Sequence, residues 1–190
     1  MPFNKMLEWF KKEKELGIEM DYTVLATVSP DSMPHSRVVA IRKIENEHLV
    51  FFTQKGTRKV EDLQHNPASS MTFFLPMQQR QIILEGTARP LSKDENQQFW
   101  QTLPRERQLR FSSYASTSGQ AIENLDQLEK RKKELSEQYA HQSIPMSEFY
   151  CGFRFTPEYF IFYSLGSISF SEVIKYSKNA KGWKQQPLSP

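Results

Sequence analysis

Residues 36–59, SRVVAIRKIENEHLVFFTQKGTRK, carry the strongest local signals in this sequence. Two apolar, β-branched runs at 37–44 and 49–53 are separated by the polar tripeptide 45–47, which predicts two strands joined by a short turn. A glycine-bearing turn follows, and a threonine then caps a short helix predicted over residues 57–65. The stretch therefore predicts two strands, a turn and a helix start in immediate succession.

Similar strand signals recur on both sides of this stretch. Further strands are predicted at residues 23–28, 71–75, 81–88, 152–163 and 172–176. Short turn signals join most of them, such as Ser29-Pro30-Asp31-Ser32. This spacing predicts a mainly β protein, built as an antiparallel barrel or a sandwich, and the pattern alone leaves both open.

Helices interrupt the strands at the periphery. They are predicted at residues 3–16, 92–103 and 122–139. Gly17 suits the end of the first, and Ser92 with Glu95 forms a capping box for the second. Residues 185–190 are predicted as a tail that crosses a surface. No composition shift marks a boundary, so residues 1–190 are predicted to form a single domain.

Composition excludes several classes of protein. The 25 Lys and Arg residues face 22 Asp and Glu, for a net charge of +3, and the signs are interspersed, which argues against a dedicated nucleic-acid binder. The basic run at 130–133 is surrounded by glutamates and an aspartate, so a solvated helix face is the better interpretation. One cysteine excludes an internal disulfide. No apolar run approaches the roughly 20 residues of a membrane span, so a cytoplasmic protein is expected.

No familiar catalytic motif is present. The sequence contains no G-x-S-x-G, H-E-x-x-H, P-loop or G-x-G-x-x-G pattern. His35, His48, His65 and His141 are scattered without metal-ligand spacing, so surface or turn roles are expected and no metal site is predicted. Any chemistry is therefore expected to come from a bound cofactor.

Cations in strand context are the most informative feature. Arg37 and Arg42 lie on one predicted strand, and Arg58 and Lys59 open the helix that follows the glycine turn. Amide groups at a helix start point outward and attract anions, so this arrangement predicts a phosphate site. The alternative is that Arg58 and Lys59 are solvated first-turn residues, although the helix dipole disfavours cations there.

Eight segments, in order and spacing, resemble the pyridoxamine 5'-phosphate oxidase family over about residues 7–190. They are VLATV (24–28), SRVVAIRKI (36–44), FFTQKGTRK (51–59), NPASSMTFF (66–74), RQIILEGTARPLS (80–92), LPRERQ (103–108), YCGFRFTPEYFIFY (150–163) and GWKQQPLSP (182–190). The resemblance implies a homodimer of split β-barrels that binds FMN at the subunit interface. It also implies oxidation of the 4' carbon of pyridoxine or pyridoxamine phosphate to the aldehyde, with O₂ reoxidising the flavin.

Residue by residue, the resemblance implies a nearly complete FMN site. It assigns FMN contacts to Arg37, Val38, Val39, Ala40, Ile41, Arg42, Phe52, Thr53, Arg58, Lys59, Gln81, Ser118, Gly119 and Tyr163. Arg58 and Lys59 would bind the phosphate, residues 38–41 would give the ring an apolar wall, and Gln81 would reach its polar edge. The pair Ser118-Gly119 would act across the interface. Tyr163 replaces a family tryptophan, and a late FMN-contacting arginine falls at Val173.

The substrate side departs from the family pattern. The residues at its substrate-contacting positions include Arg42, Phe99, Arg107, Ser169 and Ser171. A Tyr, an Arg and a Ser of the family become Phe99, Leu103 and Arg107, and an Arg-x-His becomes Ser169-Phe170-Ser171. Losing one phosphate-paired arginine removes about 1.5–3 kcal/mol, roughly one to two decades of affinity. No catalytic side chain is assigned. Arg105 and Arg107 would form either a displaced anion site or part of the surface at a helix end.

Two functions follow from this comparison. The first is an FMN-dependent oxidase of a B6 phosphate or another small reduced substrate. The second is a non-catalytic FMN carrier or sensor that has lost the substrate pocket. A haem-binding relative on the same fold is weaker, since no histidine can be assigned as a proximal ligand from the sequence.

Overall fold

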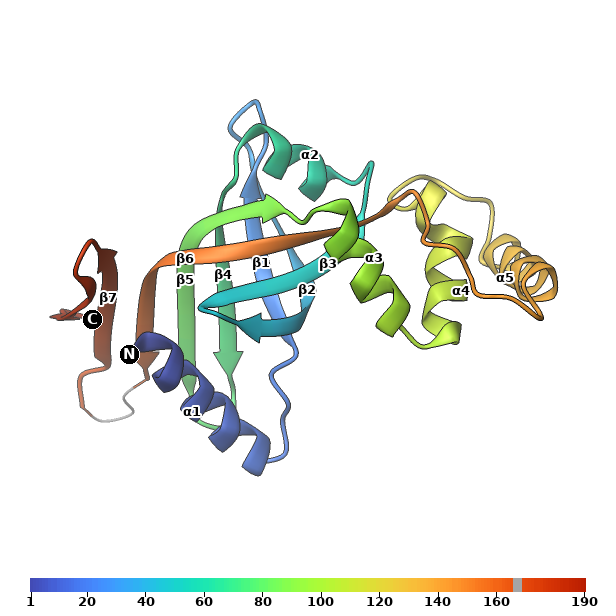
Figure 1. Cartoon of the computed structure of the whole chain (residues 1–190). Coiled ribbons are helices and arrows are strands. Elements are labelled where there is room, and N and C mark those ends of the chain that lie inside the picture. The colour runs from blue at the N-terminus through green and yellow to red at the C-terminus, as the bar shows by residue number, and fades with distance from the viewer. Residues whose placement is uncertain (166–168) are drawn as a thin grey trace. The chain divides into compact units, whose positions relative to one another are not determined.

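The computed structural model of the protein describes residues 1–165 and 169–190. In these residues the chain forms eight strands, five α-helices and one 3₁₀ helix (Figure 1). The strands are β1 (Tyr22–Val28), β2 (Pro34–Glu45), β3 (His48–Gln54), β4 (Ala68–Leu75), β5 (Arg80–Pro90), β6 (Tyr150–Ser164), β7 (Glu172–Asn179) and β8 (Gly182–Leu188). The helices are α1 (Pro2–Glu15), α2 (Arg58–His65), α3 (Lys93–Thr102), α4 (Arg105–Tyr114), η1 (Ala115–Thr117) and α5 (Asp126–Gln138).

Six strands close into an antiparallel barrel. Their order is β3-β2-β1-β4-β5-β6, and β3 also pairs with β6, which closes the ring. The hairpin β7–β8 extends the sheet from β6. The mainly β prediction is confirmed, and closure of the ring selects the barrel over the sandwich.

The chain divides into two compact units. The barrel unit comprises residues 1–51, 62–89 and 154–190, and the helical unit comprises residues 52–61 and 90–153. The single-domain organisation of residues 1–190 stays a prediction.

Alternation along the strands builds the core of the barrel unit. On β4, Met71, Phe73 and Leu75 are fully buried, while Phe74 between the last two is 55% exposed. Each buried side chain of this size stabilises the fold by about 1.5–3 kcal/mol. Helix α1 covers part of β6, because Phe3 and Trp9 contact Phe160 and Phe162 edge-on at 4.9 and 5.0 Å.

The helical unit has its own aromatic core. Its buried members are Trp100, Leu109, Phe111, Ala115, Ile144 and Tyr150. The indole Nε1 of Trp100 donates to the carbonyl of Ile144 at 3.0 Å, which satisfies its polar atom inside the core. This bond ties α3 to the segment that precedes β6.

Most predicted elements are confirmed within a few residues. The capping box is present: Ser92 accepts from the Glu95 amide, and the Glu95 carboxylate accepts from the Ser92 amide. Gly17 ends α1 with φ +102°. The turn between β2 and β3 places Asn46 and Glu47 in the left-handed region, which favours a tight reversal.

Two expectations need correction, and one helix was missed. Residues up to Leu188 form β8 and pair with β7, so the predicted tail is wrong. The sequence there, WKQQPL, lacks apolar alternation, and pairing with a neighbouring strand decides its conformation. Helix α4 was not predicted, because its sequence is polar with weak periodicity. Helix α5 begins at Asp126, four residues later than expected.

Candidate cofactor site

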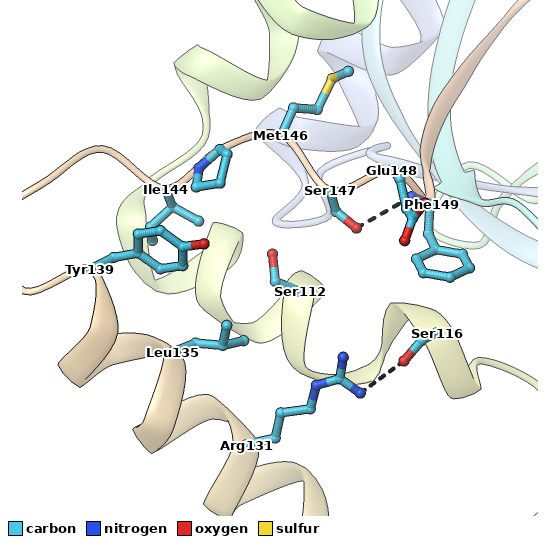
Figure 2. A pocket seen from close by; sticks show the side chains of 11 residues that line it. Ser112, Ser116, Arg131, Leu135, Tyr139, Ile144, Met146, Ser147, Glu148 and Phe149 are labelled. Carbon is cyan, nitrogen blue, oxygen red and sulfur yellow. Dashed lines mark hydrogen bonds between the residues drawn. The ribbon is translucent and has the colours of Figure 1, made fainter.

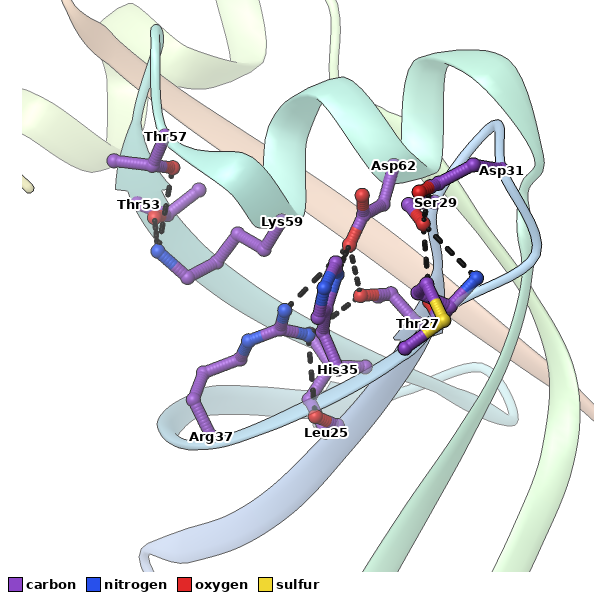
Figure 3. A network of polar contacts seen from close by, with 11 residues as sticks. Leu25, Thr27, Ser29, Asp31, His35, Arg37, Thr53, Thr57, Lys59 and Asp62 are labelled. Carbon is purple, nitrogen blue, oxygen red and sulfur yellow. Dashed lines mark hydrogen bonds and ion pairs between the residues drawn. The ribbon is translucent and has the colours of Figure 1, made fainter.

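The start of α2 gathers a lysine and two threonines. Lys59 Nζ donates to Thr53 Oγ1 at 3.1 Å and to Thr57 Oγ1 at 3.3 Å (Figure 3). Both threonines are buried, and Thr57 in turn donates to the carbonyl of Gln54 at 2.8 Å. Arg58, the first residue of α2, is exposed. The turn at Gly56, with φ +76°, lets β3 lead directly into this helix.

These groups suit a phosphate. A helix start presents backbone N–H donors to an anion. The helix dipole disfavours cations at this end, so the positive charges of Lys59 and Arg58 indicate that an anion binds there. The threonine hydroxyls hold the ammonium group close to the helix end rather than in solvent. The residues at this helix start therefore fit the phosphate of a nucleotide-like cofactor.

Gln54 links the predicted segment Ser118-Gly119 to Thr53 within the helical unit. Its Oε1 accepts from Thr53 Oγ1 and from Ser118 Oγ, both at 3.4 Å. Its Nε2 donates to the Tyr114 hydroxyl at 2.9 Å. Gly119 follows Ser118, is exposed and has φ +80°. Thr53 and Ser118 were predicted from separate segments, and Gln54, which was not predicted, brings them together.

The strand predicted to line the flavin presents two faces. Val39 and Ile41 are buried in the barrel core, whereas Val38 is 64% exposed and Ala40 is half-buried. Because the side chains of Val39 and Ile41 lie in the core, only their backbone groups are available to a ligand. Of the apolar wall predicted at residues 38–41, only the side chains of Val38 and Ala40 remain. Arg42 is exposed where the pairing of β2 with β3 shifts register, a bulge that turns its side chain outward.

Phe52 and Phe99 belong to one aromatic cluster. Their ring centroids lie 4.7 Å apart, and Phe52 stacks on Tyr150 at 5.0 Å. A Cβ on Gly152 would lie 2.5 Å from the Phe52 ring, so only glycine permits this packing. Phe99 carries no polar group, and the position where the resemblance implies a phosphate contact is therefore an apolar wall.

The other predicted residues are spread over several elements. Gln81 is half-buried on β5 opposite Phe74, and Tyr163 is half-buried on β6 opposite Val173. Arg107 is exposed on α4. Ser169 is exposed and Ser171 is half-buried in the segment before β7. Arg105 donates to the carbonyls of Tyr139 and Gln142 at 2.7 and 3.2 Å, so it links α4 to the end of α5.

A buried carboxylate, Asp62 on α2, was not predicted. Its Oδ2 accepts from Thr27 Oγ1 at 2.6 Å and lies 3.1 Å from His35 Nδ1 and 3.6 Å from Arg37 Nη2 (Figure 3). His35 is half-buried within this network, which corrects its expected surface role. Burial favours the neutral acid, but the hydrogen bonds from Thr27 and His35 and the charge of Arg37 outweigh it. The pKa of Asp62 therefore lies below its usual value.

This pKa predicts how stability depends on pH. A lowered carboxyl pKa adds stability above the unfolded value of about 3.9, and the gain disappears as pH falls through the folded pKa. Asp62→Asn should lower the free energy of unfolding at pH 7 by about 1–3 kcal/mol, because it weakens buried hydrogen bonds. Urea unfolding from pH 7 to pH 3 should show the two proteins converging below about pH 4. A constant gap across this range would contradict the assignment.

Cys151 is a buried thiol beside Thr53. Its Sγ lies 3.6 Å from the Thr53 carbonyl, and burial raises its pKa to about 11 against the charges of Lys55 and Lys59. Native protein should therefore react with iodoacetamide at pH 8 at least about 100-fold more slowly than unfolded protein. Mass spectrometry with and without urea measures both rates. Equal rates would show that the thiol is accessible.

A separate pocket lies within the helical unit (Figure 2). It has a volume of about 250 Å³ and is bounded by α4, α5 and the segment before β6. Arg131 donates to Ser116 at 2.9 Å, and Leu135 and Tyr139 follow it along α5 and at its C-terminal end, at the edge of the pocket. None of the residues predicted to bind FMN or substrate lines it.

Comparison with known proteins decides the family. A family model described as pyridoxamine 5'-phosphate oxidase matches residues 11–162. This chain belongs to the pyridoxamine 5'-phosphate oxidase family. It is 30% identical over 190 residues to the pyridoxine/pyridoxamine 5'-phosphate oxidase of Rubrobacter xylanophilus, covering 100% of this chain and 87% of the relative. The corresponding enzyme of Psychromonas ingrahamii is 30% identical over 183 residues, covering 96% and 83%.

Two solved structures share the fold. PhzG from Burkholderia lata, in complex with tetrahydrophenazine-1-carboxylic acid, superposes with a TM-score of 0.85 at 23% identity, covering 100% of this chain and 92% of PhzG. A pyridoxamine 5'-phosphate oxidase-related, FMN-binding protein from Nostoc punctiforme has a TM-score of 0.80 at 18% identity, covering 100% and 98%. The resemblance drawn from the sequence and the split β-barrel fold are thus confirmed. In residues 1–165 and 169–190, no helix is long and apolar enough to cross a membrane.

Proposed function

We propose that this protein is an FMN-dependent oxidase that acts on a small reduced substrate. The observation that carries the proposal is the cluster of Lys59, Thr53 and Thr57 at the start of α2, in a chain of this oxidase family. A cluster of this kind matches a singly esterified phosphate, which FMN carries and riboflavin lacks. We expect the protein to act in the cytoplasm.

Each predicted residue has a physical role in this proposal. Lys59 and Arg58 would neutralise the phosphate, Arg37 would contact the cofactor, and Thr53 would position Lys59. The exposed Val38 and the half-buried Ala40 would contact the apolar edge of the flavin, and the Gln81 amide would bond to its polar edge. Phe52, Arg42, Ser118, Gly119, Tyr163 and the backbone of Val39 and Ile41 complete the predicted contacts.

The protein itself needs little acid–base chemistry. Bound FMN would take up a hydride equivalent from the substrate and return the electrons to O₂. The side chains would position the substrate and exclude water, so that the reacting atoms are held in a productive geometry. This division of labour suits a sequence with no catalytic side-chain motif.

The substrate class that we propose is broader than the B6 phosphates for which the relatives are named. A phosphorylated B6 vitamer is one candidate, since two relatives at 30% identity are named for it. Phe99, which packs on Phe52, and Leu103 offer no charge at positions that contact phosphate in the family. Their apolar side chains favour a substrate that is aromatic or that carries less negative charge. The tricyclic ligand of PhzG belongs to that class.

The outer face of the barrel unit favours a homodimer, with FMN at its interface as the family resemblance implies. Val24 and Val38 face one another across β1 and β2 and are 41% and 64% exposed. Phe74 on β4 and Tyr22 on β1 are 55% and 60% exposed. Neighbouring exposed apolar side chains of this size mark an interaction surface. Light scattering should give the mass of two chains, and Val38→Glu should shift it towards one.

Purified protein incubated with FMN should turn yellow and keep flavin absorbance after desalting. Pyridoxamine phosphate, pyridoxine phosphate and a reduced tricyclic carboxylate should then be compared as substrates by H₂O₂ release. Turnover on the order of 1 s⁻¹ or more with any of them identifies an oxidase. A colourless protein that takes up no FMN during titration would refute the proposal.

A non-catalytic FMN carrier or sensor is the second candidate. Phe99 and the exposed Arg107 and Ser169, which replace residues that contact substrate in the family, favour it. Such a protein would bind FMN but release no H₂O₂ above the buffer rate with any of the three substrates. Turnover at enzymatic rates would exclude it.

A further inference from the structure

We propose that Asp62 is a positioning residue for FMN binding, because it fixes the guanidinium of Arg37. This inference rests on the proposed function, in which Arg37 contacts FMN. Asp62 itself is 1% exposed, so it would act through Arg37 rather than by touching the cofactor.

The geometry links the two side chains directly and through Thr27. Arg37 Nη2 lies 3.6 Å from Asp62 Oδ2. Arg37 Nη1 donates to Thr27 Oγ1 at 2.7 Å, and the same hydroxyl donates to Asp62 Oδ2 at 2.6 Å. Nη1 also lies 3.3 Å from the Leu25 carbonyl. Both terminal nitrogens of the guanidinium therefore have polar partners in this network.

This arrangement removes the freedom of a long side chain before a ligand arrives. A long arginine side chain loses rotamer entropy when a ligand orders it, so ordering it in the free protein improves affinity. Arg37 is about one-fifth exposed, and its held side faces the barrel interior through Thr27 and Asp62. The carboxylate thus sets the position from which Arg37 meets an anion.

The charge of Asp62 and its positioning role predict opposite changes in FMN affinity when the carboxylate is neutralised. A carboxylate near an anionic ligand repels it, so simple electrostatics expects tighter FMN binding when Asp62 is neutralised. The positioning role expects weaker binding. Asp62→Asn, which keeps the size and removes the charge, therefore separates the two.

Glu13 on α1 provides a matched control. It is fully buried in the same barrel unit and accepts from the Met77 amide and Gln78 Nε2, both at 2.8 Å. No residue predicted to bind FMN takes part in these contacts. Glu13→Gln should therefore lower the melting temperature without changing FMN affinity.

The experiment measures the FMN dissociation constant by flavin fluorescence titration and the melting temperature of each apoprotein. The variants are wild type, Asp62→Asn, Arg37→Met, the double variant, Thr27→Val and Glu13→Gln. Asp62→Asn should weaken binding about tenfold, and the double variant should bind no more weakly than Arg37→Met alone. Thr27→Val removes only the hydroxyl that links Arg37 to Asp62, so it should weaken FMN binding less than Asp62→Asn does. It replaces Asp62→Asn in the test if that variant does not fold.

The outcomes separate this inference from the proposed function. If wild type binds FMN and Asp62→Asn binds equally or more tightly, the positioning role is wrong while the flavoprotein proposal stands. Losses that add in the double variant also overturn it, since Asp62 would then act independently of Arg37. If wild type binds no FMN, both proposals fail together.

Discussion

Replacing Lys59 by methionine is expected to weaken FMN binding by about 10- to 100-fold. The substitution keeps most of the length of the side chain but removes the ammonium that Thr53 and Thr57 hold at the start of α2. A hydrogen bond to a charged partner contributes about 1.5–3 kcal/mol, which corresponds to one to two decades of affinity. Fluorescence titration with FMN and with riboflavin measures the effect, and the loss should be confined to FMN.

The matched control for this substitution is Lys93→Met. Lys93 is also a cation in the first turn of a helix of the same unit, but it is exposed where Lys59 is half-buried, and no predicted FMN residue lies in its turn. Its FMN affinity should equal that of wild type. An equal loss in both variants, or an equal loss for riboflavin and FMN in Lys59→Met, would contradict the phosphate assignment.

Among the described glycines of the barrel unit, Gly86 is the one whose replacement by alanine is expected to destabilise the protein most. A Cβ at this position of β5 would lie 2.1 Å from the carbonyl oxygen of Thr156 and 2.8 Å from Cα of Pro157. Both are backbone atoms, so the strands must separate to admit it. We expect a loss of about 3 kcal/mol or more in the free energy of unfolding, at the upper end for overpacking.

Urea denaturation of the apoprotein measures this loss. Glu85→Ala, at the exposed neighbouring position, should change stability by less than about 0.5 kcal/mol. A Gly86→Ala protein as stable as wild type would show that β5 and β6 do not approach as closely as described.

The local features of the fold were predictable because their signals are local. Short apolar, β-branched runs bounded by turn residues identified β1, β2 and β3, and the polar turn before His48 fixed the hairpin of β2 and β3. The capping box at Ser92 marked the start of α3 within one residue. Closure of the barrel by β3 and β6 was not predictable from periodicity, because about one hundred residues separate the two strands. The family resemblance supplied that long-range information.

The candidate site shows the same division. Thr53, Arg58 and Lys59 were predictable because strand, turn and helix start are consecutive in sequence. Asp62 was missed because Thr27, its closest partner, is 35 residues away. Thr27 lies two residues after the buried Leu25 on β1, so the two side chains share one face of the strand. This spacing indicates only that Thr27 points inward. A buried threonine indicates a need for a polar partner without identifying it.

The most direct test of the central claim is a titration of the purified apoprotein with FMN, followed by absorbance and fluorescence. We expect saturable binding of one FMN per chain, flavin absorbance that survives gel filtration, and far weaker binding of riboflavin. Fluorescence that rises linearly with added FMN, with no saturation and no flavin retained on the column, would contradict it.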